Sequence, residues 1–204
     1  MKLVDSNAKV TGQAWYGDDV RLPNECVAKI LRSPHHYAKV ISIDTSKVEA
    51  LPGVLAVATG QDSTTSFGVL PVTKDEHAMA VDKVRHVGDL VACVAAVDEA
   101  TALHALSLFE VEYEELEPVF DPKKGLEDAD EPIHWRGKYH LAKTNVQKRV
   151  FQEFGDRSLI DKPSASNHNK WTMKGVHHGF TEPHAVVAHW DPNGRLQLYT
   201  PSQV

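Results

Sequence analysis

Four side chains that can bind metals or move protons stand close together in the stretch VHHGFTEPH: His177, His178, Glu182 and His184. Imidazole and carboxylate groups are common zinc ligands, but a zinc site needs ligands that converge on one point. His178 and Glu182 are four residues apart, a spacing that shares one face of a helix. Gly179 and Pro183 disfavour a helix there, and a chain with 12 histidines forms such clusters easily by chance. We therefore interpret the stretch as a loop that leads into a strand, with a metal site as the alternative.

Two further groups of side chains could do chemistry. Alternate residues of a strand point to one face, so a cation site could form from three carboxylates, those of Glu110, Glu112 and Glu114. A row of exposed carboxylates is usually a solvated face, and we interpret it as one.

Ser33 precedes His35 and His36, which places a nucleophile next to two bases. Residues so close in sequence rarely have the geometry of a catalytic pair, and no carboxylate that would orient the base is evident, so we interpret this segment as a turn.

Composition and charge argue against several classes of function. The 204 residues carry a formal net charge of −6 and no long basic run, which argues against a nucleic-acid groove. The glycines do not have the G-x-G-x-x-G or P-loop spacing of nucleotide-binding sites. The longest apolar run, residues 90–97, is far shorter than the about 20 residues of a membrane helix. Two isolated cysteines, Cys26 and Cys93, are too few for an iron–sulfur cluster or a structural zinc site, and they indicate a reducing, cytoplasmic location.

The elements that would position these groups begin with two strand–helix–strand patterns. Strands are predicted for three segments, residues 26–32, 39–43 and 54–58. The capping-box spacing of Ser46 and Glu49 predicts a short helix before the third strand. Residues 90–97 are apolar throughout, which is typical of a strand covered on both faces. Asp98 can cap the next helix, and residues 109–113 alternate as a strand, so the two patterns predict a small α/β layer domain.

The pattern changes after residue 117. Prolines, a glycine and the acidic stretch LEDADEP are typical of a surface linker, which we place at residues 123–144. Residues 146–154 alternate and predict a strand, and alternation resumes at residues 171–176. Two later alternating runs are joined by Asp191-Pro-Asn-Gly194, which is the signal of a hairpin turn. The sequence therefore predicts a second, β-rich unit from about residue 145.

Five segments together carry a family resemblance. They are KVTGQAWYGDDV (9–20), LRSPHHYAKVISIDTSKVEALPGVLAVATGQD (31–62), DEHAMAVDKVRHVGDLVACVAA (75–96), EVEYEELEPVFDP (110–122) and TEPHAVVAHWDPNGRLQLYTPSQ (181–203). In this order they resemble the large, molybdenum-binding subunit of the xanthine dehydrogenase and aldehyde oxidase family. They cover most of the chain, which makes the likeness far more specific than one short motif. Two stretches, FGVLPVTKDEHAMAVDKVR and VEYEELEPVFDP, most resemble 4-hydroxybenzoyl-CoA reductase large subunits.

The resemblance implies an α+β fold. Residues 1–122 would form an α/β hammerhead domain of the aldehyde oxidase and xanthine dehydrogenase type, residues 123–144 a linker, and residues 145–204 the first β-rich part of a molybdopterin-binding domain. It implies an oxidoreductase whose molybdenum centre transfers oxygen to or from a carbon of an aromatic, heterocyclic or aldehyde substrate, with an aromatic acyl-CoA as one candidate. The expected cofactor is molybdopterin in its cytosine dinucleotide form, with iron–sulfur clusters and FAD on other subunits or domains.

The resemblance also implies which chemistry lies outside this chain. The family's glycine-rich cofactor loops and its glutamate base, which activates the metal-bound hydroxyl, lie beyond Val204. We therefore expect no catalytic residue here, no cofactor bound by this chain alone, and no turnover by it alone.

One family loop near the molybdenum ligands falls just before the E-P motif. This position makes four residues the candidates for cofactor contact: His177, His178, Gly179 and Phe180. Val176 stands where many relatives have a glutamine, and residues 156–170 match the family poorly. Because E-P opens a strand, Glu182 is expected to be structural rather than catalytic.

Two hypotheses of different classes follow. In the first, the chain belongs to an oxidoreductase complex whose partners are the remainder of the molybdenum subunit and the iron–sulfur and flavin subunits. In the second, it is a stand-alone binding or assembly module that has the hammerhead fold and no catalysis. The predicted hairpin distinguishes them, because unpaired apolar edges associate in a partial enzyme, whereas a self-sufficient module should be monomeric. Neither hypothesis expects nucleic acid or a membrane as a partner.

Overall fold

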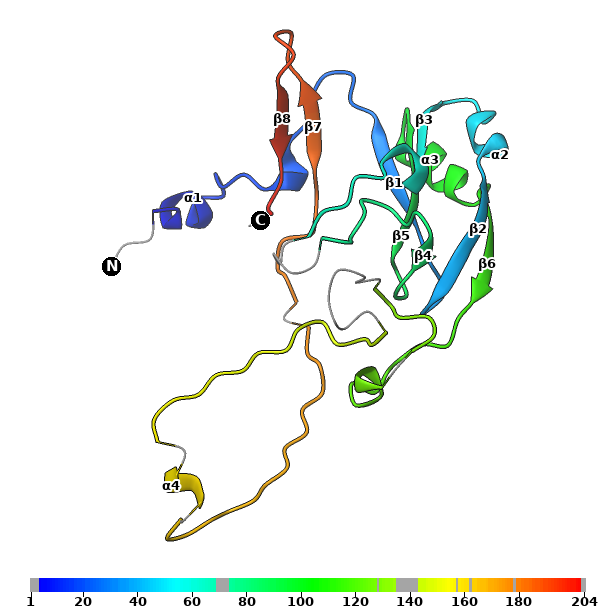
Figure 1. Ribbon diagram of the computed structural model, residues 1–204. Coiled ribbons are helices and arrows are strands. Elements are labelled where there is room, and N and C mark those ends of the chain that lie inside the picture. The colour runs from blue at the N-terminus through cyan, green and yellow to red at the C-terminus, as the bar shows by residue number, and fades with distance from the viewer. Residues whose placement is uncertain are drawn as a thin grey trace. The chain divides into compact units, whose positions relative to one another are not determined.

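The computed structural model describes residues 4–68, 74–127, 129–134, 143–156, 158–161, 163–177 and 179–202. By its contacts the chain divides into two compact units (Figure 1). The larger unit is Cys26–Phe154, and the smaller unit combines Met1–Glu25 with Gly155–Val204. The predicted limits at residues 122 and 145 refer to family domains and stay predictions.

Two three-stranded antiparallel sheets build the larger unit. We name them the β5 sheet and the β2 sheet after their central strands. The β5 sheet has the order β1-β5-β3, with bounds Val27–Arg32, Leu90–Ala96 and Val54–Thr59. The β2 sheet has the order β4-β2-β6, with bounds Lys83–Val84, Ala38–Asp44 and Glu110–Glu115. These bounds confirm five predicted strands, those at residues 26–32, 39–43, 54–58, 90–97 and 109–113, whereas the short strand β4 was not predicted.

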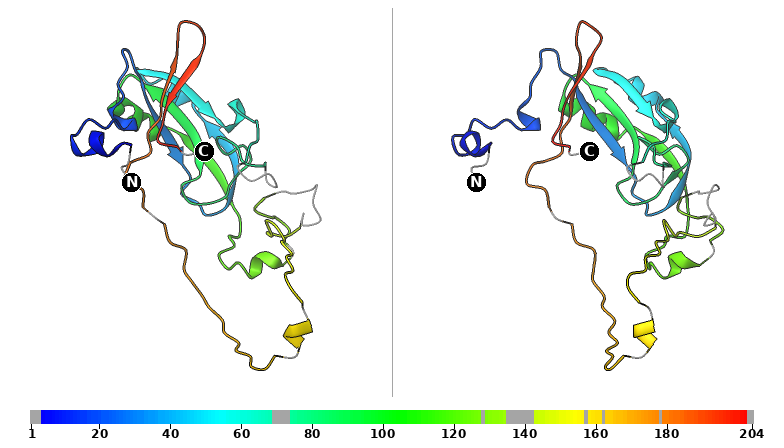
Figure 2. Two further views of the ribbon diagram at one scale, coloured as in Figure 1. Left: turned by 90° about the vertical axis from the view of Figure 1, so that its left-hand side faces the viewer. Right: turned by 60° about the vertical axis from the view of Figure 1, so that its left-hand side comes forward.

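Each predicted strand–helix–strand pattern crosses from one sheet to the other. The first runs from β2 through helix α2 (Ser46–Glu49) to β3, and the second from β5 through helix α3 (Glu99–Leu106) to β6. Figure 2 shows α3 against the β5 sheet, where it contacts β1, β5 and β3. The mixture of antiparallel sheets and short helices confirms the α+β fold class.

The buried core has two parts, and both use β5. Between the sheets, Val91 of β5 packs with Ala38 and Val84 of the β2 sheet. Under the helices, Val94 of β5 packs with Val48 of α2 and with a buried alanine of α3. A central strand with neighbours on both faces needs apolar residues at consecutive positions, which explains why residues 90–97 do not alternate.

The two helices of the larger unit begin differently from each other. Asp98 is the N-cap of α3, and its Oδ1 accepts the Thr101 N–H at 2.7 Å, as the sequence predicted. The capping box predicted at Ser46 is wrong, because the N-cap of α2 is Thr45 and no side chain caps it there. Asp44 takes part of that role, since its Oδ1 accepts the Ser46 N–H at 2.9 Å. Short 3-10 turns are η2 (Gly60–Asp62) and η3 (Lys124–Leu126).

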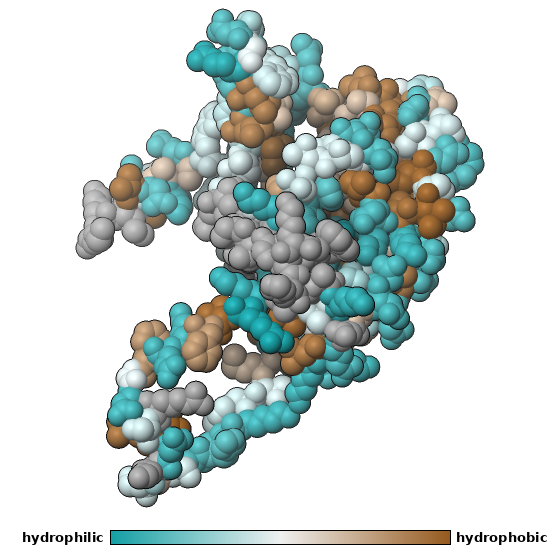
Figure 3. Space-filling model, in the orientation of Figure 1, coloured by the Kyte–Doolittle hydropathy of each residue, from teal (hydrophilic) through white to brown (hydrophobic). Residues whose placement is uncertain are grey.

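The smaller unit contains the predicted hairpin. Strands β7 (Val187–Trp190) and β8 (Leu196–Tyr199) pair antiparallel, and Gly194 in the turn has a φ of 78°. The hairpin exposes large apolar side chains, which Figure 3 shows as brown atoms on it. The unit also holds α1 (Ser6–Val10), the 3-10 turn η1 (Gly17–Asp19) and α4 (Ser158–Asp161).

Two predicted strands are wrong. Residues 146–154 and 171–176 are not strands in the structure. Their alternation does not bury one face, since Val150 and Phe151 are both exposed. A strand needs a neighbour that takes up its backbone hydrogen bonds, and a pattern of apolar residues does not supply one.

Among the described residues, no helix is long and apolar enough to cross a membrane.

Candidate functional site

The loop predicted to contact the cofactor lies in the smaller unit, before the β7–β8 hairpin. Nδ1 of His177 accepts a hydrogen bond from the Gly179 N–H at 3.0 Å. The Phe180 ring meets two imidazoles edge-on, with ring centroids 5.6 Å from His177 and 5.0 Å from His184. His178 lies outside the described residues. The structure therefore brings three of the four candidates together as a small aromatic cluster.

This aromatic cluster does not by itself fit a pterin cofactor. Phe180 is 53% exposed, and a Cβ added at Gly179 would meet no atom within 4 Å. A cofactor site is concave and places several polar groups around its ligand. Among the residues that the structure describes, no group of three His, Cys, Asp or Glu side chains could hold a metal ion. Contact between this loop and the cofactor stays a prediction.

Glu182 has a structural partner within the same unit. Its Oε1 accepts the backbone N–H of Gly17 at 3.0 Å, although 165 residues separate the two in sequence. Gly17 is buried, and a Cβ there would lie 3.2 Å from Cδ of Pro201 and 3.4 Å from Cβ of Ala185. The glutamate thus joins the η1 turn to the chain that leads into β7, which is the structural role expected of the E-P motif.

The three glutamates of β6 are paired with neighbouring side chains. The pairs are Glu110 with Lys47, Glu112 with Ser42 at 3.4 Å, and Glu114 with Lys39 at 3.1 Å. Hydrogen bonds to the carboxylates raise the pKa of the ammonium groups of Lys39 and Lys47. Exposed pairs of this kind contribute little to stability. The row is a solvated surface of the β2 sheet, as the sequence predicted.

The Ser33 segment is a turn, as predicted. The Ser33 side chain is buried, and its Oγ accepts the His35 N–H at 3.0 Å. The backbone of Ser33 is also paired, because its N–H donates to the Asp89 carbonyl at 2.9 Å. A carboxylate does approach His35, with Glu115 Oε1 at 3.3 Å from Nδ1. Since the hydroxyl is occupied by backbone groups of the turn, the arrangement does not activate a nucleophile.

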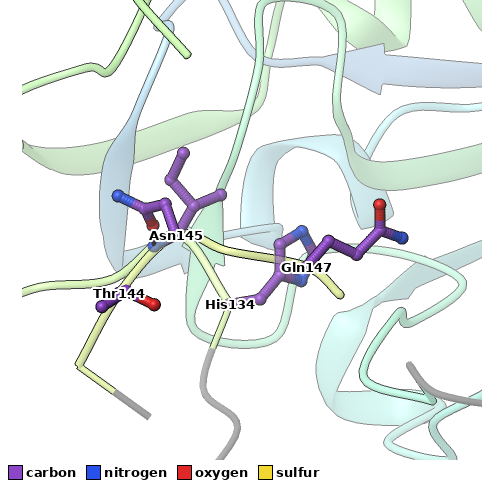
Figure 4. A pocket seen from close by; sticks show the side chains of 5 residues that line it. His134, Thr144, Asn145 and Gln147 are labelled. Atoms are coloured by element: carbon purple, nitrogen blue, oxygen red, sulfur yellow. Dashed lines mark hydrogen bonds between the residues drawn. The ribbon is translucent and has the colours of Figure 1, made fainter. Parts of the chain in front are cut away.

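Two polar pockets lie in the larger unit and share His134. The first has a volume of about 320 Å³ and is lined by Ile133, His134, Thr144, Asn145 and Gln147. Figure 4 shows Thr144, Asn145 and Gln147 on one segment and His134 on another segment that lines the same pocket. The second has a volume of about 290 Å³ and includes Asp75, His77 and Arg85. Hydroxyl, amide and imidazole groups line the first pocket, and carboxylate, imidazole and guanidinium groups line the second, so these pockets suit small polar molecules or water.

Asp75 is hydrogen-bonded to His134, the residue that the two pockets share. Oδ2 of Asp75 lies 2.8 Å from Nδ1 of His134, and both side chains are mostly buried. The other carboxylate oxygen, Oδ1, and Nδ1 of His77 are buried and have no hydrogen-bond partner among the described residues. Such atoms usually bind ordered water. Asp75 and His134 are 59 residues apart, and no local sequence pattern predicts that they meet.

Comparison with known proteins gives a consistent result. Residues 11–117 match the family model described as aldehyde oxidase and xanthine dehydrogenase, a/b hammerhead domain. The nicotinate dehydrogenase large molybdopterin subunit of Eubacterium barkeri is 33% identical over 202 residues, which are 98% of this chain and 46% of that protein. The xanthine dehydrogenase molybdenum-binding subunit of Escherichia coli O157:H7 is 31% identical over 216 aligned positions, which cover 98% of this chain and 27% of that protein.

A solved structure supports the same conclusion. The Cu,Mo-CO dehydrogenase in its carbon monoxide reduced state matches with a TM-score of 0.78 and 30% identity, over 98% of this chain and 27% of that chain. The chain thus spans about half the length of the nicotinate dehydrogenase subunit and about a quarter of the other two proteins. The hammerhead match confirms the predicted fold and covers more than half of the chain. By this match, the chain belongs to the aldehyde oxidase and xanthine dehydrogenase family.

Proposed function

We propose that this chain supplies the hammerhead part of the large subunit of a molybdopterin-dependent oxidoreductase, where it acts as a scaffold rather than as the catalytic centre. The observation that carries the proposal is the match of 98% of the chain to a protein named as a large molybdopterin subunit. The two relatives are named for nicotinate and xanthine, both nitrogen heterocycles. Among aromatic, heterocyclic and aldehyde substrates, this favours a heterocycle over an aldehyde or an aromatic acyl-CoA.

The proposal assigns a role to each part of the chain. Residues 1–122 would form the hammerhead domain, residues 123–144 the connection, and residues 145–204 the opening of the molybdopterin-binding domain. The loop with His177, Gly179 and Phe180 would line one side of the molybdenum site, with molybdopterin in its cytosine dinucleotide form. When bound, that cofactor supplies the oxygen-transfer chemistry. The residues of this loop would supply only an aromatic wall and a backbone turn.

The partners follow from the same proposal. They are the remainder of the molybdenum subunit and the iron–sulfur and flavin subunits, in the cytoplasm. Two free cysteines, Cys26 and Cys93, fit a reducing compartment. The scaffold role is supported by the pairing of the candidate side chains, because Glu182, Ser33 and the glutamates of β6 are all engaged in structural contacts.

Metal analysis of two preparations tests the proposal. The isolated chain should contain no molybdenum and oxidise no heterocycle. A complex purified through this chain, together with the remainder of the molybdenum subunit and the redox subunits, should contain stoichiometric molybdenum and oxidise the heterocycle. Turnover by the isolated chain would refute the scaffold role, and a complex that lacks molybdenum would refute the family function.

The stand-alone binding module is the second candidate. It is favoured if the isolated chain is monodisperse and monomeric, because a self-sufficient module should leave no apolar strand edge unpaired and exposed. The exposed apolar side chains of the β7–β8 hairpin argue against it, since Trp190, Leu196 and Leu198 need a covering surface. Sedimentation of the isolated chain at several concentrations distinguishes the two, because only the partial subunit should associate.

A further inference from the structure

Side chains of the larger unit bind the carbonyl groups of an extended segment, residues 131–133. The Tyr37 hydroxyl donates to the Pro132 carbonyl at 2.9 Å and lies 3.2 Å from the Glu131 carbonyl. Nε of Arg85 donates to the Ile133 carbonyl at 2.9 Å, and Nζ of Lys83 donates to the Pro132 carbonyl at 3.4 Å. The segment belongs to the stretch that the sequence predicts as a linker. Its consecutive carbonyls are therefore bound to the sheet rather than exposed to water.

The three donors are also hydrogen-bonded to one another and are mostly buried. Tyr37 is 4% exposed, and the side chains of Lys83 and Arg85 are 13% and 17% exposed. Nζ of Lys83 donates to the Tyr37 hydroxyl oxygen at 3.2 Å, and the Arg85 guanidinium donates to the Lys83 carbonyl at 3.0 Å. Cationic side chains that are buried to this degree need partners, because an unpaired one is costly. The carbonyls of the segment are such partners.

The other side of the segment is bound as well. The Ile133 N–H donates to Oδ1 of Asn145 at 2.8 Å. The Asn145 N–H in turn donates to the Gly125 carbonyl at 3.1 Å, and the Ala129 N–H donates to the Lys143 carbonyl at 2.7 Å. Pro132 is buried and has no N–H that would need a partner. The polar groups of this backbone are thus satisfied by one row of donors and one amide acceptor.

We propose that Tyr37, Lys83 and Arg85 form a recognition surface for an extended peptide backbone, and that its occupant is residues 131–133 of the same chain. The surface donates hydrogen bonds to backbone carbonyl groups, which every residue has. Binding of the segment therefore does not depend on the side chains of Glu131 and Ile133. The docked segment keeps Asn145 next to Gly125 and so fixes where the chain continues. The proposal concerns the larger unit alone and does not depend on the proposed function.

Amide hydrogen exchange on the full chain, followed by NMR, tests the recognition surface. The Arg85→Lys substitution keeps the charge but removes the guanidinium bond to Ile133. The Ile133 and Asn145 amides should then exchange about five- to tenfold faster, which corresponds to the loss of one hydrogen bond of ordinary net strength. The amides of β5 should exchange at the wild-type rate. Arg32→Lys is the matched control, because Arg32 donates to the Gly88 carbonyl and lies outside the segment.

Two further substitutions separate backbone recognition from side-chain recognition. Tyr37→Phe removes only the hydroxyl and should accelerate exchange at Ile133 and Asn145 as Arg85→Lys does. Glu131→Gln removes the charge that faces Lys83 but leaves the backbone carbonyl. These rates should change by less than about twofold, since the Glu131 side chain is 50% exposed and the amide oxygen can still accept a hydrogen bond from Lys83.

Three results would overturn the proposal. The first is wild-type exchange in both Tyr37→Phe and Arg85→Lys, which would mean that the carbonyl contacts do not hold the segment. The second is equal acceleration of the β5 amides, which would mean that the donors stabilise the whole unit instead. The third is acceleration by Glu131→Gln as large as that by Arg85→Lys, which would mean that a side chain is recognised.

Discussion

The backbone N–H of Gly17 donates a hydrogen bond to Oε1 of Glu182 at 3.0 Å, and this contact joins the two ends of the smaller unit. Glu182→Ala removes the acceptor, so the Gly17 amide should exchange with solvent about fivefold faster or more, in line with the loss of a hydrogen bond to a charged group. NMR-detected hydrogen exchange measures the rate directly.

Glu182→Gln is the control for this contact, because the amide oxygen can still accept from Gly17. It should keep most of the protection that Glu182→Ala loses. Equal exchange rates in wild type and Glu182→Ala would show that the contact does not hold the η1 turn. Slow exchange of the Gly17 amide in Glu182→Ala, together with fast exchange of the same amide in Glu182→Gln, would also contradict the assigned hydrogen bond.

Gly60 should tolerate no side chain. A Cβ added at Gly60 would lie 2.1 Å from the Ala80 carbonyl oxygen and 2.6 Å from its carbonyl carbon, both of them backbone atoms. Gly60→Ala should therefore lower the free energy of unfolding by about 3 kcal/mol or more, the upper range for overpacking. Urea unfolding followed by circular dichroism measures this loss.

Gly175→Ala is the matched control for Gly60→Ala, since a Cβ added there would meet nothing within 4 Å. Its unfolding free energy should stay within about 0.5 kcal/mol of the wild type. Equal stability of the Gly60→Ala and Gly175→Ala variants would contradict the close approach of the η2 turn to Ala80.

The Asp98 cap of α3 should make stability depend on pH. The backbone N–H of Thr101 lowers the pKa of the Asp98 carboxyl below its ordinary value of 3.8. A group whose pKa is lower in the folded state stabilises fully above its unfolded pKa, and loses that effect as the pH falls through the folded pKa. The stability difference between wild type and Asp98→Ala should therefore shrink as the pH drops below 3.8.

Asp98→Asn provides the comparison, because an amide oxygen also caps helices but does not titrate. Its stability difference from Asp98→Ala should stay constant over the same pH range. Urea unfolding of the three proteins at a series of pH values gives both differences. If the difference in unfolding free energy between the wild type and Asp98→Ala does not change with pH, the capping carboxyl is not ionised.

The two cysteines should differ in reactivity. Burial raises the pKa of the Cys93 thiol in the central strand β5, whereas Cys26 is exposed. The thiolate is the reactive form, so Cys26 should react with a disulfide reagent at least about tenfold faster than Cys93 at neutral pH. Absorbance of the released thiolate follows both reactions.

Single substitutions assign the two reactions. Cys26→Ser should leave only the slow reaction, and Cys93→Ser only the fast one. The Cys93 thiol is protonated at neutral pH. As long as the pH is below its pKa, the reaction rate of Cys93 in the Cys26→Ser variant should therefore rise about tenfold for each unit by which the pH is increased. A fast reaction in Cys26→Ser would contradict the burial of Cys93.

Local patterns in the sequence predicted most of the secondary-structure elements. Five strands of the larger unit, the Asp98 cap and the β7–β8 hairpin were predictable, because each depends on residues close to one another in the chain. The hairpin illustrates this, since Asp191 and Gly194 carry the turn and lie within four residues. The four aromatic and glycine candidates at 177–180 came from family resemblance rather than from such a pattern.

How these elements combine depends on contacts between residues far apart in the chain. β2 and β3 lie in different sheets, residues 146–154 do not form a strand, and Asp75 pairs with His134 as Gly17 does with Glu182. The Arg85 bond to the Ile133 carbonyl is another such contact, across 48 residues. These contacts form between residues far apart in the chain. Patterns of neighbouring residues do not predict them, because they depend on how the chain folds back on itself.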